Sequence, residues 1–535
     1  MDKWLIDLKK TVAIYLDRSD TMLDIIYNCF EHHITYVPID VSWPMTRVQQ
    51  VLQDSRVRKV ITERKYESLF LEYDCCLIED KVTLNKLFSD VYDNDIGYVL
   101  YTSGSTGVPK GVAVYREAVL NLIEGVIDVI NMSKNDTIAC ITSVSFDIFV
   151  VESILAKYIG MNVVMANNEE QSNPKLLVKL IRDNNVNIIQ MTPSRMQLLL
   201  SYDRELKCLE KAKYIMLGGE AFPYNLLKIL QSKTKAKIYN LYGPTETTVW
   251  SSISDLTEKD KIDIGFPIKN TEIFILDSEH KSVAVGEIGE ICIAGKGLAK
   301  GYVGRPDLTR ERFLKIKELG NQLVYRTGDS GRYLESGELE CFGRLDNQIK
   351  LNGYRIELEE IEAHLCGCEG ITQALVALES INDKQELVAY YISERGMDEL
   401  SIRNYLKDHI PVYMIPSAYR RVKQFNYTSN GKIDRHDTTS LVYESAAVTI
   451  GEYELNDMRK DILHRLCSEL TITVDEQSLM NMSFSDAGID SIIYLGLIAK
   501  FEDIYDVMFD ECALHGVNFY RISDFVDYCE KIISE

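Results

Sequence analysis

Short β-prone runs alternate with helical patterns over the first two-thirds of the chain, and this alternation constrains the fold more than any other feature. Four runs each end in a polar or glycine-containing turn: 95–103, 186–192, 212–220 and 236–246. A strand followed by a turn and a helix is the unit of a layered α/β fold, in which ligand sites lie at strand ends. The sequence therefore predicts an α/β protein with its sites at these turns.

The pattern changes toward the C-terminus. From about residue 270, runs such as TEIFILD and GEICIAG have the glycine turns typical of antiparallel strands. Near the end of the chain, ELNDMRKDILHRLCSEL and SIIYLGLIAKFEDIY have helical periodicity. We predict a core over 1–345, a small α+β unit over 346–437, a linker over 438–454 and an all-helical unit over 455–535.

Composition disfavours several classes of function. The chain has 535 residues and a formal net charge of −22, without a basic cluster of the kind that binds nucleic acid. It has no signal-peptide pattern and no run of about 18 apolar residues. Its 12 cysteines lack zinc spacing and are too sparse for a disulfide scaffold. We therefore expect a cytoplasmic protein with reduced thiols and with neither a nucleic-acid nor a membrane partner.

The stretch YTSGSTGVPKG, at 101–111, has the composition of a phosphate-binding loop. Its glycines allow close backbone approach, its hydroxyls are donors and its lysine adds a positive charge. It is not a Walker A motif, because no Gly-Lys-Ser/Thr follows at the required spacing. By composition alone, a polar surface loop is equally compatible. The residues concerned are Thr102, Ser103, Gly104, Ser105, Thr106, Gly107, Lys110 and Gly111.

The order of residues in this loop resembles the phosphate-loop signature of the adenylate-forming superfamily, whose members activate a carboxylate with ATP and pass it to a thiol. Further stretches resemble the other motifs of that family, in the family's order, and cover nearly all of residues 30–435. They are TYVPID, FDIFV, NLYGPTETTVW, GEIGEICIAGKGLAKGY, YRTGDSGRY, GRLDNQIKLNGYRIELEEIE and NGKIDR. A lone motif is weak evidence, but this ordered series argues strongly against chance.

The family can be narrowed further. The forms YVPID and RIELEEIE resemble the adenylation domain of a nonribosomal peptide synthetase, and FSDAGIDSI (484–492) resembles its carrier-domain motif. The resemblance implies a large adenylate-forming N-terminal core, a small α+β C-terminal subdomain and a carrier domain of the four-helix type. Family members have several dozen more residues before VAIYLDRS, so the resemblance implies an N-terminally short core.

By this resemblance, one set of residues binds ATP and magnesium. Glu246 matches the family's magnesium ligand, in accord with the preference of hard cations for carboxylate oxygen. Tyr242 would stack on adenine and Asp329 would bind both ribose hydroxyls. The full set implied for ATP and AMP is Thr102, Ser103, Gly104, Ser105, Thr106, Gly107, Lys110, Gly219, Asn240, Tyr242, Gly243, Thr245, Asp329 and Arg344.

The resemblance also assigns residues to catalysis and movement. Lys432 in NGKIDR matches the catalytic lysine, which would bridge the substrate carboxylate and the α-phosphate. Asp346 matches a hinge about which the small subdomain would rotate between two poses. One pose would bring in Lys432, and the other would present KLNGYR, where Gly353 gives room for a thin arm. Ser491 matches the attachment point of 4′-phosphopantetheine, although a serine at a helix start is commonly just an N-cap.

The implied amino-acid pocket begins at Asp147, which would bind the α-ammonium group. Trp250 would close the far end, where a bulky ring leaves little room for a side chain. Arg195 is a departure: it can point away and leave glycine favoured, or pair with an acidic side chain and favour aspartate or glutamate. In order, the lining resembles the family's pattern for glycine and consists of Ile148, Val151, Arg195, Met216, Gly218, Leu241, Val249 and Trp250.

We therefore predict an ATP-dependent ligase that forms an aminoacyl adenylate, releases pyrophosphate and loads its own carrier, with ATP, Mg²⁺ and 4′-phosphopantetheine as cofactors. Expected partners are the amino acid, a phosphopantetheinyl transferase and other synthetase modules, and the need for an MbtH-like protein stays open. One alternative is an acyl or aryl acid–coenzyme A ligase, against which Asp147 and the carrier motif argue. Another is an inactive nucleotide-binding scaffold, against which Lys432, Glu246 and Asp329 argue.

Overall fold

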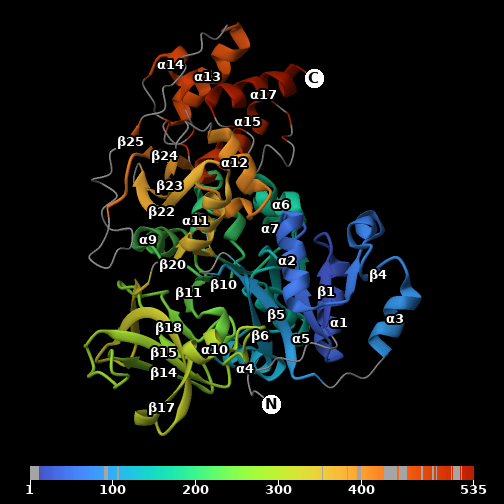
Figure 1. Ribbon diagram of the computed structural model, residues 1–535, viewed down its shortest axis with the longest axis vertical. Helices are drawn as coiled ribbons and strands as arrows, with labels where there is room; N and C mark the ends of the chain where they lie inside the picture. The colour runs from blue at the N-terminus through green and yellow to red at the C-terminus, as the bar shows by residue number, and fades with distance from the viewer. Residues whose placement is uncertain are drawn as a thin grey trace.

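Two seven-stranded sheets form the N-terminal part of the protein (Figure 1). The computed structural model describes residues 11–89, 94–104, 108–346, 348–351, 353–381, 384–393, 399–426, 443–444, 455–470, 474–482, 491–505 and 521–534, together with 484, 487, 489, 507, 509 and 519. The first sheet has the order β16-β6-β5-β2-β1-β3-β4. Its strands are β1 (Thr11–Tyr15), β2 (Thr35–Pro38), β3 (Lys59–Thr62), β4 (Asp74–Leu77), β5 (Ile96–Thr102), β6 (Lys110–Tyr115) and β16 (Gly301–Tyr302). The helices along it are α1 (Asp20–Glu31), α2 (Met45–Ser55), α3 (Lys81–Ser89) and α4 (Arg116–Val129).

The second sheet has the order β13-β12-β11-β10-β9-β7-β8, and its strands from β11 to β8 are parallel. Its strands are β7 (Thr137–Cys140), β8 (Asn162–Met165), β9 (Ile188–Met191), β10 (Tyr214–Gly218), β11 (Lys237–Tyr242), β12 (Ser252–Asp255) and β13 (Phe266–Pro267). The helices between them are a π-helical turn (Val151–Leu155), α5 (Ala156–Ile159), α6 (Asn168–Ser172), α7 (Pro174–Asp183), α8 (Pro193–Tyr202) and α9 (Tyr224–Lys233). The strands predicted within 95–103, 186–192, 212–220 and 236–246 are confirmed as β5, β9, β10 and β11.

Local sequence explains where α7 and α8 begin. Each starts with a proline, which lacks the backbone N–H that would be unsatisfied at that position. The preceding residue, Asn173 or Thr192, accepts hydrogen bonds from backbone N–H groups of the first turn. Both N-cap residues also contact the C-terminal part of the chain, Asn173 through Glu502 and Thr192 through Gly353.

The third sheet is antiparallel, as the runs after residue 270 predicted. Its strands are β14 (Thr271–Leu276), β15 (Gly289–Gly295), β17 (Phe313–Ile316), β18 (Gln322–Tyr333) and β19 (Leu339–Arg344), with α10 (Pro306–Arg312) beside them. The chain then enters the C-terminal subdomain, which begins with the hairpin of β20 (Gln348–Leu351) and β21 (Tyr354–Glu357).

A four-stranded sheet completes the C-terminal subdomain. It consists of β22 (Ile371–Ile381), β23 (Lys384–Ser393), β24 (Ala418–Val422) and β25 (Tyr443–Glu444), together with α11 (Leu358–Gly367) and α12 (Glu399–Lys407). The pairing of β25 with β24 places two residues of the predicted linker in this sheet. The rest of 438–454 lies outside the described residues, so the linker stays a prediction.

The end of the chain is helical, as predicted, and Figure 1 draws it in red beyond the C-terminal subdomain. The helices are α13 (Asp457–Leu470), α14 (Glu476–Asn481), α15 (Ser491–Tyr505) and α17 (Ile522–Ser534). They share an apolar core of their own, in which Phe525 contacts Phe484, Tyr494, Phe501, Phe509 and Phe519. In the described part of the chain, no helix combines the length and the apolar character needed to cross a membrane.

Candidate active site

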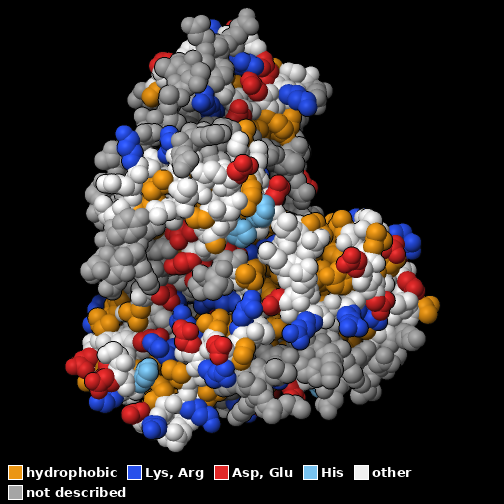
Figure 2. All heavy atoms as spheres, viewed as in Figure 1, with side chains coloured by type: hydrophobic (Ala, Val, Ile, Leu, Met, Phe, Trp, Pro, Cys, Tyr) orange, Lys and Arg blue, Asp and Glu red, His pale blue; other side chains and the backbone are white. Residues whose placement is uncertain are grey.

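One cavity gathers most of the residues that the motifs assign to nucleotide and amino acid. It lies where the ends of β5, β10 and β11 meet β18, β19 and the β20–β21 hairpin. Figure 2 shows acidic and basic side chains along the boundary between the core and the C-terminal subdomain. The predicted residues that line the cavity are Thr102, Ser103, Asp147, Ile148, Gly219, Gly243, Thr245, Trp250, Asp329, Arg344 and Gly353. Outside the described residues lie Ser105, Thr106, Gly107, Lys432 and the side chain of Ser491.

The described part of the phosphate loop is held by the C-terminal subdomain. The backbone N–H of Gly104 donates to Glu360 at 2.8 Å, and the Lys110 ammonium pairs with Glu357 at 2.7 Å. Burial lowers the pKa of Lys110, and the Arg355 cation nearby lowers it further. The Thr102 hydroxyl oxygen is buried and has no partner among the described residues. Lys110, the Gly104 N–H and the Thr102 hydroxyl are groups that bind phosphate, so these residues fit a nucleotide.

Glu246 is a fully buried carboxylate with two strong partners. It accepts a hydrogen bond from the Tyr302 hydroxyl at 2.7 Å and pairs with Arg355 at 2.7 Å. Burial alone would raise the pKa of Glu246, but the Arg355 and Lys110 cations lower it to about 2. An ionised carboxylate here fits a hard cation such as Mg²⁺. In this structure the Arg355 guanidinium supplies the positive charge that Glu246 requires.

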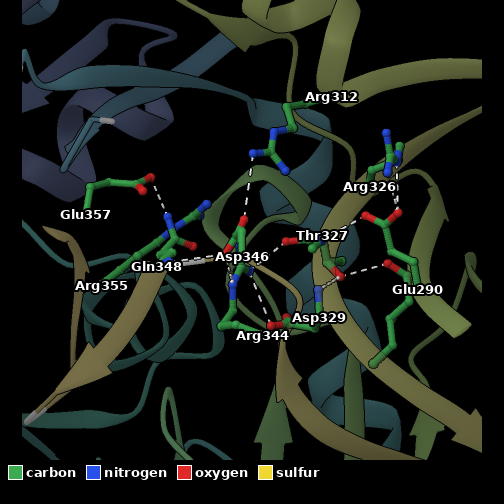
Figure 3. Close-up of polar contacts among 12 residues, drawn as sticks. Glu290, Arg312, Arg326, Thr327, Asp329, Arg344, Asp346, Gln348, Arg355 and Glu357 are labelled. Atoms are coloured by element: carbon green, nitrogen blue, oxygen red, sulfur yellow. Dashed lines mark hydrogen bonds and ion pairs between the residues drawn. The ribbon is translucent and has the colours of Figure 1, made fainter. Parts of the chain in front are cut away.

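The predicted ribose site is a connected polar network at the β18–β19 hairpin (Figure 3). Asp329 accepts from the Tyr242 hydroxyl at 2.6 Å and pairs with Arg344 at 3.2 Å. Arg344 continues to the predicted hinge, where it pairs with Asp346 at 2.6 Å. The Tyr242 ring also lies under the Lys350 ammonium, 5.7 Å from its centroid. Tyr242, Asp329 and Arg344 are therefore brought together as the motifs predicted.

Asn240 is placed differently from its predicted neighbours. Its side chain is buried, and its amide donates to the backbone carbonyl of Asp263 at 2.8 Å. Strand β11 continues from Asn240 to Tyr242 and the turn that contains Glu246. In this structure the Asn240 side chain therefore anchors the strand that delivers the cavity residues.

Asp147 lies at the amino-acid end of the cavity, where the predicted substrate pocket begins. It accepts a hydrogen bond from the Thr245 hydroxyl at 2.6 Å. Burial raises the pKa of Asp147 to about 6, although the hydrogen bonds from Thr245 and the Ile148 backbone oppose this. A partly buried carboxylate that forms no ion pair with the described residues suits an ammonium group, which would stabilise its charged form.

A tight turn places Trp250 at the end of this pocket. Thr248 and Val249 both have φ of 65°, a left-handed conformation that is strained for β-branched residues. A Cβ at Gly218 would lie 2.6 Å from the Trp250 ring, so only glycine fits behind the indole. The other predicted wall residues, Val151, Met216, Leu241 and Val249, belong to the same buried apolar core as Trp250 and are not among the residues that line the cavity.

Gln190, which the motifs did not identify, holds the indole in place. It is fully buried on β9, and its carbonyl oxygen accepts from the Trp250 ring N–H at 3.0 Å. Its amide donates to the Ile148 carbonyl at 3.0 Å and to Glu152 at 3.3 Å. A signal existed in the sequence, because Gln190 is a polar residue within the apolar run of a buried strand.

Arg195 is not among the residues that line the cavity. It is a first-turn residue of α8, and its guanidinium donates to the backbone carbonyl of Gln171 on α6. Of the two orientations left open by the sequence, the structure shows the one in which Arg195 turns away from the pocket. The polar side chain that contacts the Trp250 indole is Gln190.

The loop between β20 and β21 enters the core beside the cavity. Gly353 has φ of 84°, and a Cβ there would lie 2.5 Å from the Thr192 methyl group. The Gly353 backbone N–H donates to Glu220, which also accepts from the Ser194 hydroxyl at 2.7 Å. The next residue, Tyr354, stacks on Tyr413 with ring centroids 3.7 Å apart. Gly353 and Tyr354 of KLNGYR therefore lie against the core, as the second predicted pose requires, while the rotation between the two poses stays a prediction.

Comparison with known proteins decides the family. The sequence model described as AMP-binding enzyme matches residues 6–303, more than half of the chain. The chain belongs to this family. Zwittermicin A synthase ZmaJ of Bacillus cereus is 33% identical over 446 residues, which are 79% of this chain and 84% of that protein. The dimodular nonribosomal peptide synthase of Bacillus subtilis (strain 168) is 32% identical over 533 residues, and this chain spans 22% of its length.

Two solved nonribosomal peptide synthetase structures are similar to this chain. Holo-AB3403, a four-domain nonribosomal peptide synthetase, is 29% identical with a TM-score of 0.60, over 99% of this chain and 39% of that one. Holo-PA1221, which contains adenylation and peptidyl carrier domains, supports the fold with a TM-score of 0.77 at 22% identity, over 98% of this chain and 88% of that one. Within the AMP-binding family, the chain is therefore an ATP-dependent adenylating ligase of the nonribosomal peptide synthetase type.

The raised pKa of Asp147 predicts a pH dependence for amino-acid activation. The side chain is charged above about pH 6 and neutral below it, and only the carboxylate can pair with an ammonium. We expect kcat/KM for the amino acid, measured by ATP–pyrophosphate exchange, to fall as pH drops through about 6. Asp147→Asn should abolish this fall of kcat/KM at low pH and should lower kcat/KM by about 10–100-fold. A flat wild-type profile between about pH 5 and 7 would contradict this role.

The Gly353–Thr192 contact predicts that a side chain at Gly353 hinders the observed pose. Gly353→Ala should slow acyl transfer to a thiol by roughly tenfold or more, because overpacking costs about 1–3 kcal/mol. ATP–pyrophosphate exchange should be spared. Gly286→Ala is the matched control, since Gly286 has φ of 89° and no neighbouring atom within 4 Å of a Cβ.

Thr192→Ser keeps the hydroxyl that caps α8 and removes the colliding methyl group. Combined with Gly353→Ala, it should restore much of the transfer rate. Equal transfer by Gly353→Ala and the wild type would show that this pose is not needed for the step.

Proposed function

We propose that this chain activates glycine with ATP as glycyl adenylate, releases pyrophosphate and passes the glycyl group to phosphopantetheine on its own C-terminal helical unit. The observation that carries the proposal is the joining of three sites in one cavity. The phosphate loop begins at Thr102, the ribose network centres on Asp329, and Asp147 marks the amino-acid end. When the ammonium group of an amino acid pairs with Asp147, its carboxylate would face the α-phosphate of a nucleotide bound between the other two sites.

The choice of glycine rests on the closed pocket end. The indole of Trp250 is fixed by Gln190 and lies against Gly218, which leaves little room beyond Ile148. The structure of holo-AB3403 has AMP and glycine bound, and that protein is 29% identical to this chain. Aspartate and glutamate become the weaker alternative, because Arg195 bonds to α6 and does not line the cavity.

Adenylation requires the carboxylate oxygen to attack the α-phosphorus while pyrophosphate leaves. The negative charge at the phosphates would be met by Lys110, by the Gly104 N–H and by Lys432, whose catalytic role is carried over from the motif NGKIDR. Magnesium, held by Glu246 together with phosphate oxygens, would supply further charge neutralisation. Glu246 can hold magnesium only after its ion pair with Arg355 breaks.

The observed pose belongs to the second half of the reaction in this proposal. Arg355 pairs with Glu246, and Glu357 pairs with Lys110. Glu360 accepts a hydrogen bond from the Gly104 N–H. The subdomain therefore covers the groups that would bind magnesium and phosphate. Rotation about Asp346 would exchange these contacts for Lys432 and the nucleotide phosphates. Pyrophosphate must therefore leave before the KLNGYR loop can enter.

Ser491 would hold the phosphopantetheine arm, which supplies the thiol that accepts the glycyl group. It is the first residue of α15, and a helix N-terminus favours an attached phosphate. A phosphopantetheinyl transferase and further synthetase modules are the partners this implies, in the cytoplasm, with an MbtH-like protein as a further candidate. The coenzyme A ligase alternative is less favoured, because Asp147 has no use with an acid that lacks an ammonium group.

An exchange panel with purified protein tests the substrate. We expect glycine to give the fastest ATP–pyrophosphate exchange and alanine the next, because excluding one methyl is worth only about 1–3 kcal/mol. Trp250→Ala should lower the glycine-to-alanine ratio of kcat/KM by about tenfold or more. Trp250→Phe keeps a ring and should change the ratio less. Lys432→Ala should abolish most exchange while nucleotide still binds.

Preference for aspartate over glycine, or strong activity with a large aromatic amino acid, would refute the pocket assignment. Adenylation would still stand in either case. No exchange with any amino acid would refute the proposed activity itself and would favour the inactive scaffold.

A further inference from the structure

The last helical unit touches the core at a small surface formed by α7 and α8. Helix α15 packs against both of these helices, at sequence separations of about 300 residues. We propose that this surface, with Asn173 at its centre, is the docking site for α15 of the same chain, and that the Asn173–Glu502 bond fixes the docked register. The inference rests on the proposed transfer to Ser491 and names the residues that would bring the arm to the core.

Asn173 uses both ends of its amide. Its carbonyl oxygen caps α7 by accepting from the backbone N–H groups of Lys175 and Leu176, at 2.9 and 3.4 Å. Its amide nitrogen donates to Glu502 on α15 at 2.8 Å. Asn173 has no exposed surface and Glu502 is 1% exposed, so the bond is shielded from water. A buried hydrogen bond to a charged acceptor is stronger than one between neutral groups.

The two carboxylate oxygens of Glu502 accept hydrogen bonds from different parts of the chain, one from its own helical unit and one from the core. One accepts the backbone N–H of Phe509 at 3.0 Å, and the other accepts from Asn173. Without Asn173, the second oxygen would be left buried and without a hydrogen bond in the docked state, which destabilises a charged group. Glu502 also faces the N-terminus of α7, whose partial positive charge favours a carboxylate.

A second contact shows how closely the helices approach. A Cβ at Gly496 on α15 would lie 3.3 Å from the Ser201 hydroxyl oxygen on α8. Such spacing is tighter than ordinary van der Waals contact, so a side chain at Gly496 would press α15 away from the core. The two contacts lie on α15 at positions 496 and 502, and together they define its orientation on α7 and α8.

The test uses the full chain carrying phosphopantetheine, and it measures glycine loading by intact mass together with ATP–pyrophosphate exchange. Asn173→Asp keeps the carbonyl-type oxygen that caps α7, removes the donor and sets a second carboxylate against Glu502. We expect loading to slow by about tenfold, the equivalent of about 1.4 kcal/mol, with exchange unchanged. Asn167→Asp is the matched control, because Asn167 caps α6 in the same way and is exposed.

A reciprocal change separates docking from general damage. Glu502→Gln, added to Asn173→Asp, leaves an oxygen for the Phe509 N–H and turns an amide donor toward the new carboxylate. This double variant should recover most of the wild-type loading rate. Gly496→Gln should slow loading without harming α15, since glutamine favours helix more than glycine does. Ile504→Gln on the exposed side of α15 should load normally.

Loading by the wild type should not depend on protein concentration, as a contact within one chain requires. Normal loading by Asn173→Asp, or no recovery in the double variant, would overturn the docking assignment. If the wild type exchanges pyrophosphate and carries the arm but takes no glycine, the proposed transfer itself is wrong. Ser491→Ala gives the background level of glycine loading, because this variant should carry no phosphopantetheine arm.

Discussion

The ion pair between Glu246 and Arg355 joins the two halves of the site, and the observed pose depends on it. Glu246 is fully buried, and a buried carboxylate that loses its partner is destabilised by about 3–5 kcal/mol. The Arg355 and Lys110 cations lower the pKa of Glu246 and so favour its ionised form. In the proposed function, the positive charge beside Glu246 would come from Arg355 in the observed pose and from magnesium when nucleotide binds, with Lys110 nearby in support.

The same reasoning extends to the phosphate loop. Lys110 and the Gly104 N–H face Glu357 and Glu360, two carboxylates of the C-terminal subdomain, while Glu246 faces a guanidinium. The subdomain thus offers negative groups where phosphate would bind and a positive group where magnesium would bind. In the proposed function, nucleotide phosphates would compete with the observed pose for the same partners, which would give the order of the two half-reactions an electrostatic basis. The tight fit of Gly353 against Thr192 adds a steric condition to the same pose.

Much of this could be predicted from the sequence, because strand ends and ordered motifs determine where Asp147, Trp250, Tyr242 and Asp329 lie relative to one another. Strands β9, β10 and β11 were predicted from apolar runs that end in turns. Gln190 was missed because its role depends on the direction of the Trp250 ring N–H on another strand. The direction of Arg195 depends on a carbonyl of α6, and contacts such as Asn173–Glu502 join segments that no periodicity relates.

The central claim is that nucleotide phosphates and the C-terminal subdomain exclude each other at Glu246 and Lys110. The most direct test is the distance between spectroscopic labels at the exposed positions Glu124 and Leu400, measured with and without magnesium and a non-cleavable ATP analogue. The account predicts that the analogue shifts the distance distribution, and that Arg355→Ala shifts it at lower analogue concentration. An analogue that binds by calorimetry but leaves the distance unchanged would contradict the account.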